Sequence, residues 1–475
     1  MFQSGERAQT PRPAVRLAAH ARSKFMLLHA EVLVGSPDLA RLGLVALALA
    51  LQTAVLFSPG HFRPAASGMV AILVALGTLG SLALALLASL DLKRCLVRPL
   101  RQALAAAALA VLAVLAVIGI QQGTNGVWAI AHGMNYTNDG AVMDLYAAHQ
   151  VRFGHNPYVQ TNIVRALANV DAPARTVTPL MDGQFRGLRA YPSDGAIEQA
   201  LLNVLHYRDT QGVPVPSEFE SKYNYPAGSF LVILPFVWMG VQDMRFLYTL
   251  AILAMAVYLW ARMPRSLRLL VPLLLLANVP IIAHAAGGQP DPIYGLMLMI
   301  GYAEWRRRWT SPLAMGLATA TKQLAWFFLP FYLLLVIRRF GWREAARRSG
   351  LIGLTFLLTN GPFILLSPGG YLASISAPMR DPMFPLGIGI IALFASNVLP
   401  LLPKVAFTLA ELGSWLACVA ASLRLRFLTP ASGIVFAALP LLFAWRSLVN
   451  YFYLVPLLVL AVALAERSPA ARSET

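Results

Sequence analysis

The stretch at residues 103–120, ALAAAALAVLAVLAVIGI, contains no charged side chain. Its apolar residues form a continuous run without alternation, which is typical of a membrane-spanning helix and not of a strand in an outer-membrane barrel. Similar runs recur along a chain that is 58% hydrophobic and only 12% charged, against about 25% charged residues in soluble domains. We therefore predict an all-α, polytopic transmembrane helical bundle. The composition excludes a soluble enzyme, a nucleic-acid-binding protein and a disordered scaffold.

The number of spans follows from the lengths of the apolar runs. A span needs roughly 20 apolar residues and a half helix needs fewer, so we predict about 12 to 14 spans or half-spans. The run at 311–337 is expected to form two short helices, because Lys322 and Gln323 interrupt its middle. The candidate spans are residues 41–58, 68–90, 103–120, 226–241, 244–261, 267–285, 290–304, 311–337, 349–367, 385–402, 405–423, 428–445 and 449–465.

The distribution of charge predicts the orientation of the bundle. Lys and Arg total 38 against 21 Asp and Glu, and short basic clusters lie between the apolar runs, as in cytoplasmic loops. Residues 121–225 differ, because this hydrophilic segment holds nine acidic and seven basic residues. With the N-terminus inside, three spans place it outside. The predicted organisation is a basic cytoplasmic segment at 1–40, transmembrane helices at 41–120, an extracytoplasmic loop at 121–225, a transmembrane core at 226–466 and a tail at 467–475.

Counting every later run as a full crossing produces a conflict. The turn Gly287–Asp291 would then lie inside and the basic turn around Pro264 would lie outside, which reverses the positive-inside rule. We expect either a re-entrant segment between residues 226 and 285 or a further span hidden in the long loop. The sequence does not distinguish these two alternatives.

The hydrophilic loop opens with a carboxylate at the start of a helix. Apolar and aromatic residues from Val142 to Phe153 recur at spacings of three and four, and Gly154 is a natural stop. Asp139 therefore lies at the N-terminus of this helix, as an N-cap or as a catalytic carboxylate held rigidly. Asp144 lies roughly 140° further round the helix. The two carboxylates therefore cannot form an acid–base pair that faces one small site.

These residues resemble the first outer-loop signature of the C-type (GT-C) glycosyltransferases, in the bacterial polyprenyl-phosphate-mannose-dependent mannosyltransferase-like branch. That signature is an Asp, a short helix and then an Asn/Asp-Pro-Tyr motif, and three later pieces agree in order. Ala227 departs from the pattern, because a second proline is usual there, and the spans before residue 120 are more than the family usually has. The matching pieces are Asp139-Gly140-Ala141, Tyr146-Ala147-Ala148, Gly154-His155-Asn156-Pro157-Tyr158, Lys222-Tyr223-Asn224-Tyr225-Pro226, Gly288-Gln289-Pro290-Asp291, Gly316-Leu317-Ala318 and Thr321-Lys322-Gln323.

The resemblance implies a multi-pass enzyme of a bacterial cytoplasmic membrane with its active site on the extracytoplasmic side. Such enzymes move a sugar, here mannose or another hexose, from a polyprenyl phosphate to a glycolipid or glycan acceptor of the cell envelope, usually with inversion. A single displacement needs one base on the acceptor hydroxyl and charge stabilisation on the leaving phosphate. In the family the first-loop Asp is that base, and Asp139 is the matching position. Asp144 is the alternative base, because aligning the signature through Tyr146 in a different register would select that residue.

Three basic residues are candidates for binding the donor phosphate. Lys322 stands among apolar neighbours, which indicates a functional site unless its side chain snorkels to the interface. Arg446 either clamps the phosphate bidentately or is one more positive-inside residue. Arg380 lies in a loop that is outer if 349–367 runs outward. The substrate-binding candidates are Gln323, Gln289, Asp291, Tyr158, Tyr225 and Asn450. Asp291 could instead only end a helix, and the tyrosines could anchor the loop at the interface.

The sequence gives little indication of other ligands. No spacing of His, Asp and Glu indicates a metal site, so we expect no metal and no cofactor beyond the lipid-linked sugar, with membrane lipids and no nucleic acid as partners. Neither Cys95 nor Cys418 indicates a disulfide. The alternative function is a multi-span transporter or lipid flippase, which accounts for the spans and for Lys322. It leaves unexplained a 105-residue loop that opens with Asp139.

Overall fold

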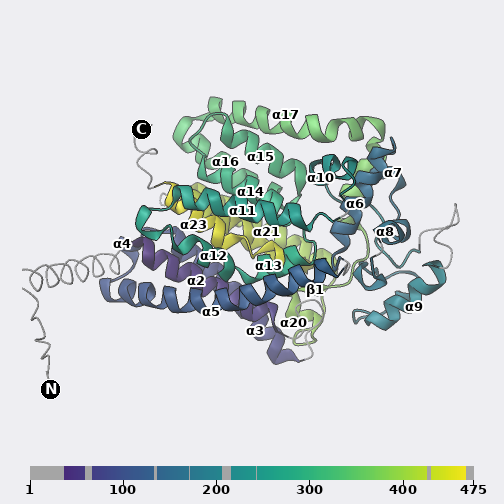
Figure 1. The fold of residues 1–475 in the computed structure, drawn as a ribbon, viewed down its shortest axis with the longest axis horizontal. Helices are drawn as coiled ribbons and strands as arrows, with labels where there is room; N and C mark the ends of the chain where they lie inside the picture. Colours follow the sequence, from purple (N-terminus) through teal and green to yellow (C-terminus); the bar gives the residue numbers. More distant parts are fainter. Residues whose placement is uncertain are drawn as a thin grey trace, which may run out of the picture.

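Helices dominate the computed structural model of the protein (Figure 1). It describes residues 37–58, 67–132, 136–170, 172–205, 216–241, 243–424 and 429–466. The strands in this part of the chain are β1 (Leu386–Gly387) and β2 (Arg446–Ser447), which pair in parallel. The predicted all-α fold is confirmed. The predicted basic segment 1–40 lies outside the described residues as far as residue 36, and so does the predicted tail 467–475.

Within the described ranges, six helices are long and apolar enough to span a membrane. The third of them has 34 residues and continues to Ala131, well beyond its predicted end at residue 120. Gly119 lets this helix approach a neighbour closely, because a Cβ atom there would lie 1.8 Å from the carbonyl oxygen of Leu276. The six are α2 (Pro37–Leu56), α3 (Gly68–Ser89), α5 (Arg98–Ala131), α11 (Arg245–Arg262), α17 (Trp342–Leu366) and α21 (Lys404–Arg424).

Shorter helices, some of them joined end to end, complete the bundle. At Asn278 the side-chain oxygen caps the following helix at Ile281 N, and the side-chain amide donates to the Tyr453 carbonyl oxygen over 3.3 Å. A second break falls at Lys322 and Gln323, as predicted for 311–337. These helices are α4 (Leu92–Cys95), α12 (Leu270–Ala277), α13 (Val279–Ala286), α14 (Asp291–Ala303), α15 (Thr310–Thr321), α16 (Leu324–Phe340), α22 (Pro430–Ala438) and α23 (Val455–Ala465), with 3₁₀ turns η3 (Arg265–Leu267), η4 (Leu439–Phe443) and η5 (Val449–Tyr451).

The predicted span at 385–402 is wrong. This segment contains β1, the five-residue helix α20 (Ile391–Ala395) and irregular chain. Gly387 has φ +137°, a conformation that favours glycine, and a Cβ atom there would lie 2.1 Å from the Ser447 carbonyl oxygen. The apolar residues of this segment therefore cover the strand pair and do not cross the membrane as one helix.

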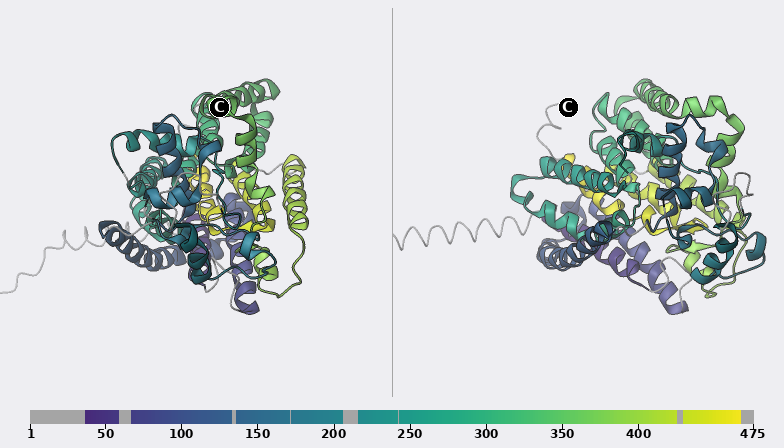
Figure 2. Two further views of the ribbon diagram at one scale, coloured as in Figure 1. Left: turned by 90° about the vertical axis from the view of Figure 1, so that its right-hand side faces the viewer. Right: turned by 45° about the vertical axis from the view of Figure 1, so that its right-hand side comes forward.

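The hydrophilic segment folds into short helices at one end of the bundle, which we call the loop end (Figures 1 and 2). Their apolar faces form a core of their own, which includes Val142, Ile163 and Phe230. The elements of the loop end are α6 (Asp139–Arg152), α7 (Pro157–Gln160), α8 (Ile163–Val170), η1 (Ala174–Thr176), η2 (Gly183–Phe185), α9 (Asp194–Leu205), α10 (Gly228–Trp238), α18 (Pro368–Ile375) and α19 (Ala377–Arg380).

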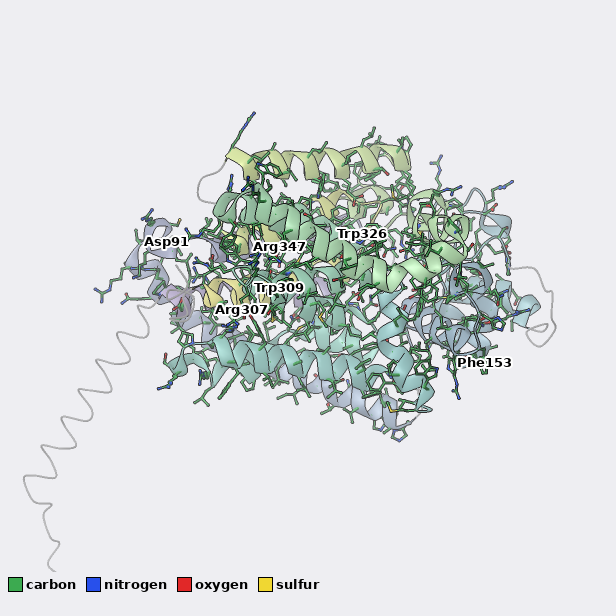
Figure 3. All side chains as sticks on the ribbon, turned by 90° about the horizontal axis from the view of Figure 1, so that it is seen from above. Asp91, Phe153, Arg307, Trp309, Trp326 and Arg347 are labelled. Carbon is green, nitrogen blue, oxygen red and sulfur yellow. The ribbon has the colours of Figure 1, made fainter. Side chains whose placement is uncertain are left out.

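Basic residues gather at the opposite end, which we call the basic end. Arg262 and Arg307 both pair with Glu304 there, at the ends of α11 and α14. Figure 3 shows Asp91 and Arg307 toward this end and Phe153 at the other. The charge pattern of the sequence therefore agrees with the fold, because the basic turns and the hydrophilic loop lie at opposite ends of the bundle.

Helix α10 resolves the predicted conflict of orientation. At its start Gly228 packs on the Ala320 carbonyl, beside the break at Lys322. Beyond its end, Met244 N donates to the Tyr136 hydroxyl over 2.9 Å, also at the loop end. Helix α10 therefore begins and ends at the loop end without crossing. Helix α11 then runs to the basic end, so that the turn around Pro264 lies there and the turn Gly287–Asp291 returns to the loop end.

Candidate active site

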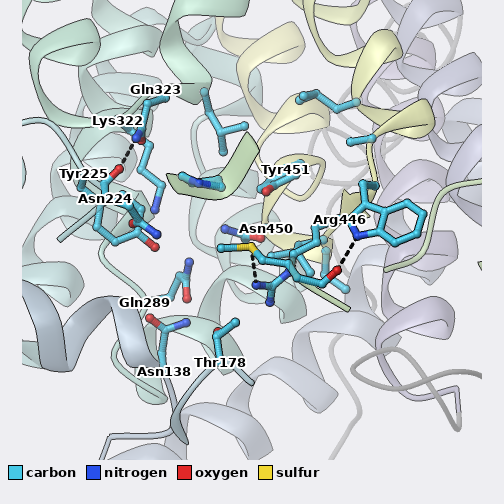
Figure 4. A pocket seen from close by; sticks show the side chains of 18 of the residues that line it. Asn138, Thr178, Asn224, Tyr225, Gln289, Lys322, Gln323, Arg446, Asn450 and Tyr451 are labelled. Atoms are coloured by element: carbon cyan, nitrogen blue, oxygen red, sulfur yellow. Dashed lines mark hydrogen bonds between the residues drawn. The ribbon is translucent and has the colours of Figure 1, made fainter. Parts of the chain in front are cut away.

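A cavity of about 810 Å³ lies at the loop end, between the short helices and the bundle. Figure 4 shows polar side chains from three directions facing it, with Thr178 on one side, Lys322 on another and Arg446 on a third. On a further side, the peripheral helix α21 contributes both polar and apolar side chains, those of Thr408, Glu411, Leu412 and Trp415 (Figure 2). The predicted site residues that line the cavity are Asp139, Tyr225, Gln289, Lys322, Gln323, Arg446 and Asn450.

Asp139 presents its carboxylate to this cavity from the first turn of α6. The N-cap is Asn138, whose side chain accepts from Ala141 N over 3.1 Å, so the interpretation of Asp139 itself as the N-cap is wrong. Asp139 Oδ2 accepts from the Thr178 hydroxyl over 2.5 Å, and Oδ1 accepts from the adjacent Gly140 N–H. Among the described residues, no basic side chain forms an ion pair with this half-buried carboxylate. It remains available to accept a proton from a hydroxyl.

Asp144 lies beneath the cavity and does not line it. Its side chain is 1% exposed, and its Oδ1 accepts from the hydroxyls of Tyr223 (2.5 Å) and Ser229 (2.6 Å). Burial raises the pKa of Asp144 to about 6, an effect that the two hydroxyls oppose. The carboxylate that the structure brings to the cavity is therefore Asp139.

Lys322 is neutralised within the wall of the cavity. Its Nζ lies 3.0 Å from Asp291 Oδ1 and 4.0 Å from the centre of the Tyr225 ring, with both members of the ion pair buried. Asp291 does not line the cavity, and its other oxygen is held by three donors. These are Gln289 Nε2 (3.0 Å), Asn450 Nδ2 (2.8 Å) and the Tyr453 hydroxyl (3.2 Å). Asp291 thus orients two predicted site residues, Gln289 and Asn450, and compensates the charge of a third, Lys322.

Arg446 lines the cavity and forms no ion pair among the described residues. It lies on β2, and its Nη1 contacts Met383 Sδ at 3.4 Å. Its Nε is buried without a hydrogen-bond partner in the described part of the chain. Lys404 also lines the cavity, but its ammonium donates to the carbonyl oxygens of Pro378 (3.0 Å) and Asp381 (2.8 Å). A guanidinium of this kind suits an anionic ligand group.

A short ladder of extended chain connects the carboxylate to the guanidinium. Glu220 N donates to the Thr178 carbonyl oxygen over 2.9 Å, and Met181 N donates to the Pro382 carbonyl oxygen over 2.7 Å. The segment that begins at Thr178 therefore holds the hydroxyl partner of Asp139 and pairs with the chain that carries Met383. Sequence reasoning missed Thr178 and Glu220, because both lie in irregular chain without periodicity.

Besides Asp144 and Asp291, two further predicted residues do not line the cavity. Tyr158 is buried among aromatic rings, and its hydroxyl donates to the Tyr225 carbonyl oxygen over 2.8 Å. Arg380 is exposed at the end of α19. Gln323 does reach the cavity wall, where its amide donates to the Asn224 carbonyl oxygen. The two cysteines are free, as expected.

Comparison with known protein families gives a match to part of the chain. The model of glycosyltransferase family 87, a GT-C-type membrane family, matches residues 223–383, about a third of the chain. The matched range includes Tyr225, Gln289 and Lys322, and it begins after Asp139. No curated protein and no solved structure matches. Together, the multi-pass helical fold and this match support a membrane glycosyltransferase of the GT-C type.

Proposed function

We propose that this protein transfers mannose or another hexose from a polyprenyl phosphate to a hydroxyl of an extracytoplasmic glycolipid or glycan, with inversion. The observation that carries the proposal is that Asp139 and Arg446 line one cavity and that neither forms an ion pair within the described part of the chain. A single displacement needs a base for the attacking hydroxyl and a positive group for the leaving phosphate. Asp139 would be the base and Arg446 would bind the phosphate.

The charge of the cavity favours a monophosphate donor. Lys322 is paired with Asp291, and the Lys404 ammonium is occupied by backbone carbonyls. Arg446 can form two parallel hydrogen bonds to one phosphate group. Lys322 would have a positioning role. It fixes the Tyr225 ring, and its partner Asp291 orients the side-chain amides of Gln289 and Asn450. Two apolar side chains of α21, Leu412 and Trp415, line the cavity and would contact the prenyl chain.

The distribution of basic residues between the two ends of the bundle supports an extracytoplasmic site. The basic end carries Arg262 and Arg307, which by the positive-inside rule would face the cytoplasm. The loop end, with the cavity, would then face outward from a bacterial cytoplasmic membrane.

Transfer of radiolabelled mannose from polyprenyl-phosphate mannose to endogenous lipid, in membranes, tests the proposal. We expect Asp139→Asn to lower the rate at least a hundredfold, because the change removes the base and keeps the acceptor for the Thr178 hydroxyl. Asp182→Asn is the matched control, since Asp182 pairs with Arg186 outside the cavity. Unchanged transfer by the Asp139→Asn protein would contradict the role of Asp139. Absence of transfer by the native chain with any polyprenyl-phosphate hexose would favour a transporter or flippase.

A further inference from the structure

Glu220 is a carboxyl group in the wall of the cavity that the proposed reaction does not use. The residue is 6% exposed and lines the cavity. Its Oε1 accepts from Lys222 N over 2.9 Å. Its Oε2 is buried and accepts no hydrogen bond in the described part of the chain. A buried acceptor without a donor is costly, so a ligand that supplies a donor would be favoured at this position.

Thr178 connects Glu220 to the proposed base. The Thr178 hydroxyl donates to Asp139 Oδ2, and its carbonyl oxygen accepts from Glu220 N. The two carboxyl groups therefore flank one residue, and both line the same cavity. A ligand with a hydroxyl at Asp139 and a further hydroxyl close to it can reach both groups.

The charges around Glu220 favour a neutral donor over an ammonium group. Asp381 is the nearest acidic neighbour, and both of its carboxylate oxygens already accept from Lys222 Nζ at 2.9 Å. Lys404 Nζ donates to the Asp381 carbonyl oxygen. Burial raises the pKa of Glu220 to about 7, and Asp381 raises it further through its charge and a hydrogen bond between the two carboxyl groups, while Lys222 opposes the shift. Two lysines already balance the two acids, so a hydroxyl is the donor that adds no further charge.

We propose that Glu220 binds a second hydroxyl of the acceptor, next to the hydroxyl that Asp139 deprotonates. This inference rests on the proposed function and specifies its acceptor as a polyol such as a sugar ring. A simple alcohol has only the attacking hydroxyl and leaves Glu220 without its donor. Glu220 is thus a specificity-determining residue, which selects among acceptors by the hydroxyl beside the one that reacts.

Calorimetric titration of octyl hexosides into the full-length protein in nanodiscs tests this inference without any donor. The probes are the octyl glycosides of mannose, glucose and galactose and the monodeoxy analogues of the one that binds best, with heats from empty nanodiscs subtracted. We expect Glu220→Gln to raise the Kd of the best hexoside about tenfold. The glutamine keeps the acceptor for Lys222 N and places an amide where the free oxygen was. Glu218→Gln is the matched control, because Glu218 bonds to Gln184 and does not line the cavity.

The deoxy analogues give the decisive comparison. Removing one particular hydroxyl should weaken binding to the native protein about tenfold and binding to the Glu220→Gln protein less than twofold. Equal losses in both proteins, an unchanged Kd in Glu220→Gln, or no binding of any hexoside to the native chain would overturn the inference. Hexoside binding that follows the expected pattern, without transfer from any polyprenyl-phosphate sugar, would contradict only the proposed function.

Discussion

Lys322 can keep its charge within an apolar segment because Asp291 lies opposite it, and this pairing makes a prediction about stability. Replacing either residue alone, as Lys322→Met or Asp291→Asn, leaves one buried charge without its partner. We expect each change to lower the free energy of unfolding by about 3–5 kcal/mol. The double variant should lose less than the sum of the two. Thermal or denaturant unfolding of the four proteins in detergent measures the coupling.

The Lys222–Asp381 pair provides the control for this cycle. Lys222 is 47% exposed, so the same experiment with Lys222→Met and Asp381→Asn should show a coupling of about 1 kcal/mol or less. If the cycle through Lys322 and Asp291 were additive, the buried pair would not be a unit. Asp291 would then not neutralise Lys322, and there would be no reason to assign phosphate binding to Arg446 in preference to Lys322.

Asp144 makes a prediction about pH, because burial raises its pKa from 3.8 to about 6. The folded protein therefore binds this proton more tightly than the unfolded chain does. The stabilisation from the protonated carboxyl is fully present below about pH 4 and is lost as the pH rises through 6. We expect the melting temperature of the native protein to fall relative to that of Asp144→Asn between pH 5 and pH 7, and the difference to stay constant from pH 7 to 8. Parallel curves for the two proteins would show that Asp144 does not titrate in this range.

At the scale of elements, the sequence predicts helix breaks where a polar residue interrupts an apolar run. Lys322 and Gln323 mark such a break, and the structure has one there. The false span at 385–402 shows the limit of this reasoning. Its apolar composition satisfies a hydropathy rule, whereas Gly387 and the pairing with β2 decide its actual conformation. A partner that lies about 60 residues away along the chain cannot be inferred from a local window.

Helix α10 shows a similar limit and makes a topological prediction. Its 11 residues are as apolar as those of a span, and only their contacts at both ends show that they do not cross. In a background with Cys95→Ser and Cys418→Ser, we expect Met239→Cys to react with an impermeant maleimide from the same side as Arg186→Cys. Ser266→Cys, in the turn between α11 and α12, should react only from the opposite side.

Right-side-out and inverted vesicles of the same preparation provide the controls for this labelling. All three positions are exposed, so a lack of reaction would report sidedness and not burial. Labelling of Met239→Cys and Arg186→Cys from opposite sides would mean that α10 crosses the membrane. The cavity could not then have the wall described above.

At the scale of the whole molecule, the candidate site depends on segments that are distant in sequence. Asp139 is on α6, Thr178 is in the loop after η1, and Arg446 is near the end of the chain. Motif order alone selects Asp139 and Lys322 as candidates. It gives no reason to prefer Arg446 over Arg380, because both follow apolar segments. The strand pair and the ladder through Met181 place only Arg446 at the cavity, so the distinction comes from tertiary contacts.

Binding of the lipid product tests this long-range arrangement of the molecule. A ligand that binds only the folded state stabilises it by about 2.7 kcal/mol at a concentration of 100 times Kd. We expect undecaprenyl monophosphate to raise the melting temperature of the native protein in detergent, whereas undecaprenol, which lacks the phosphate, should have little effect. Arg446→Gln should abolish most of the shift, because this guanidinium lines the cavity and forms no ion pair among the described residues.

Arg380→Gln is the matched control, because Arg380 is exposed and does not line the cavity. It should respond to undecaprenyl monophosphate as the native protein does. The diphosphate should stabilise the native protein no more than the monophosphate, since one guanidinium leaves the second phosphate group without a partner. A larger shift with the diphosphate, or an equal loss of the shift in both arginine variants, would place the phosphate elsewhere in the molecule. The phosphate would then be bound by residues other than Arg446, and the neutralisation of Lys322 by Asp291 would not explain the selectivity of the cavity.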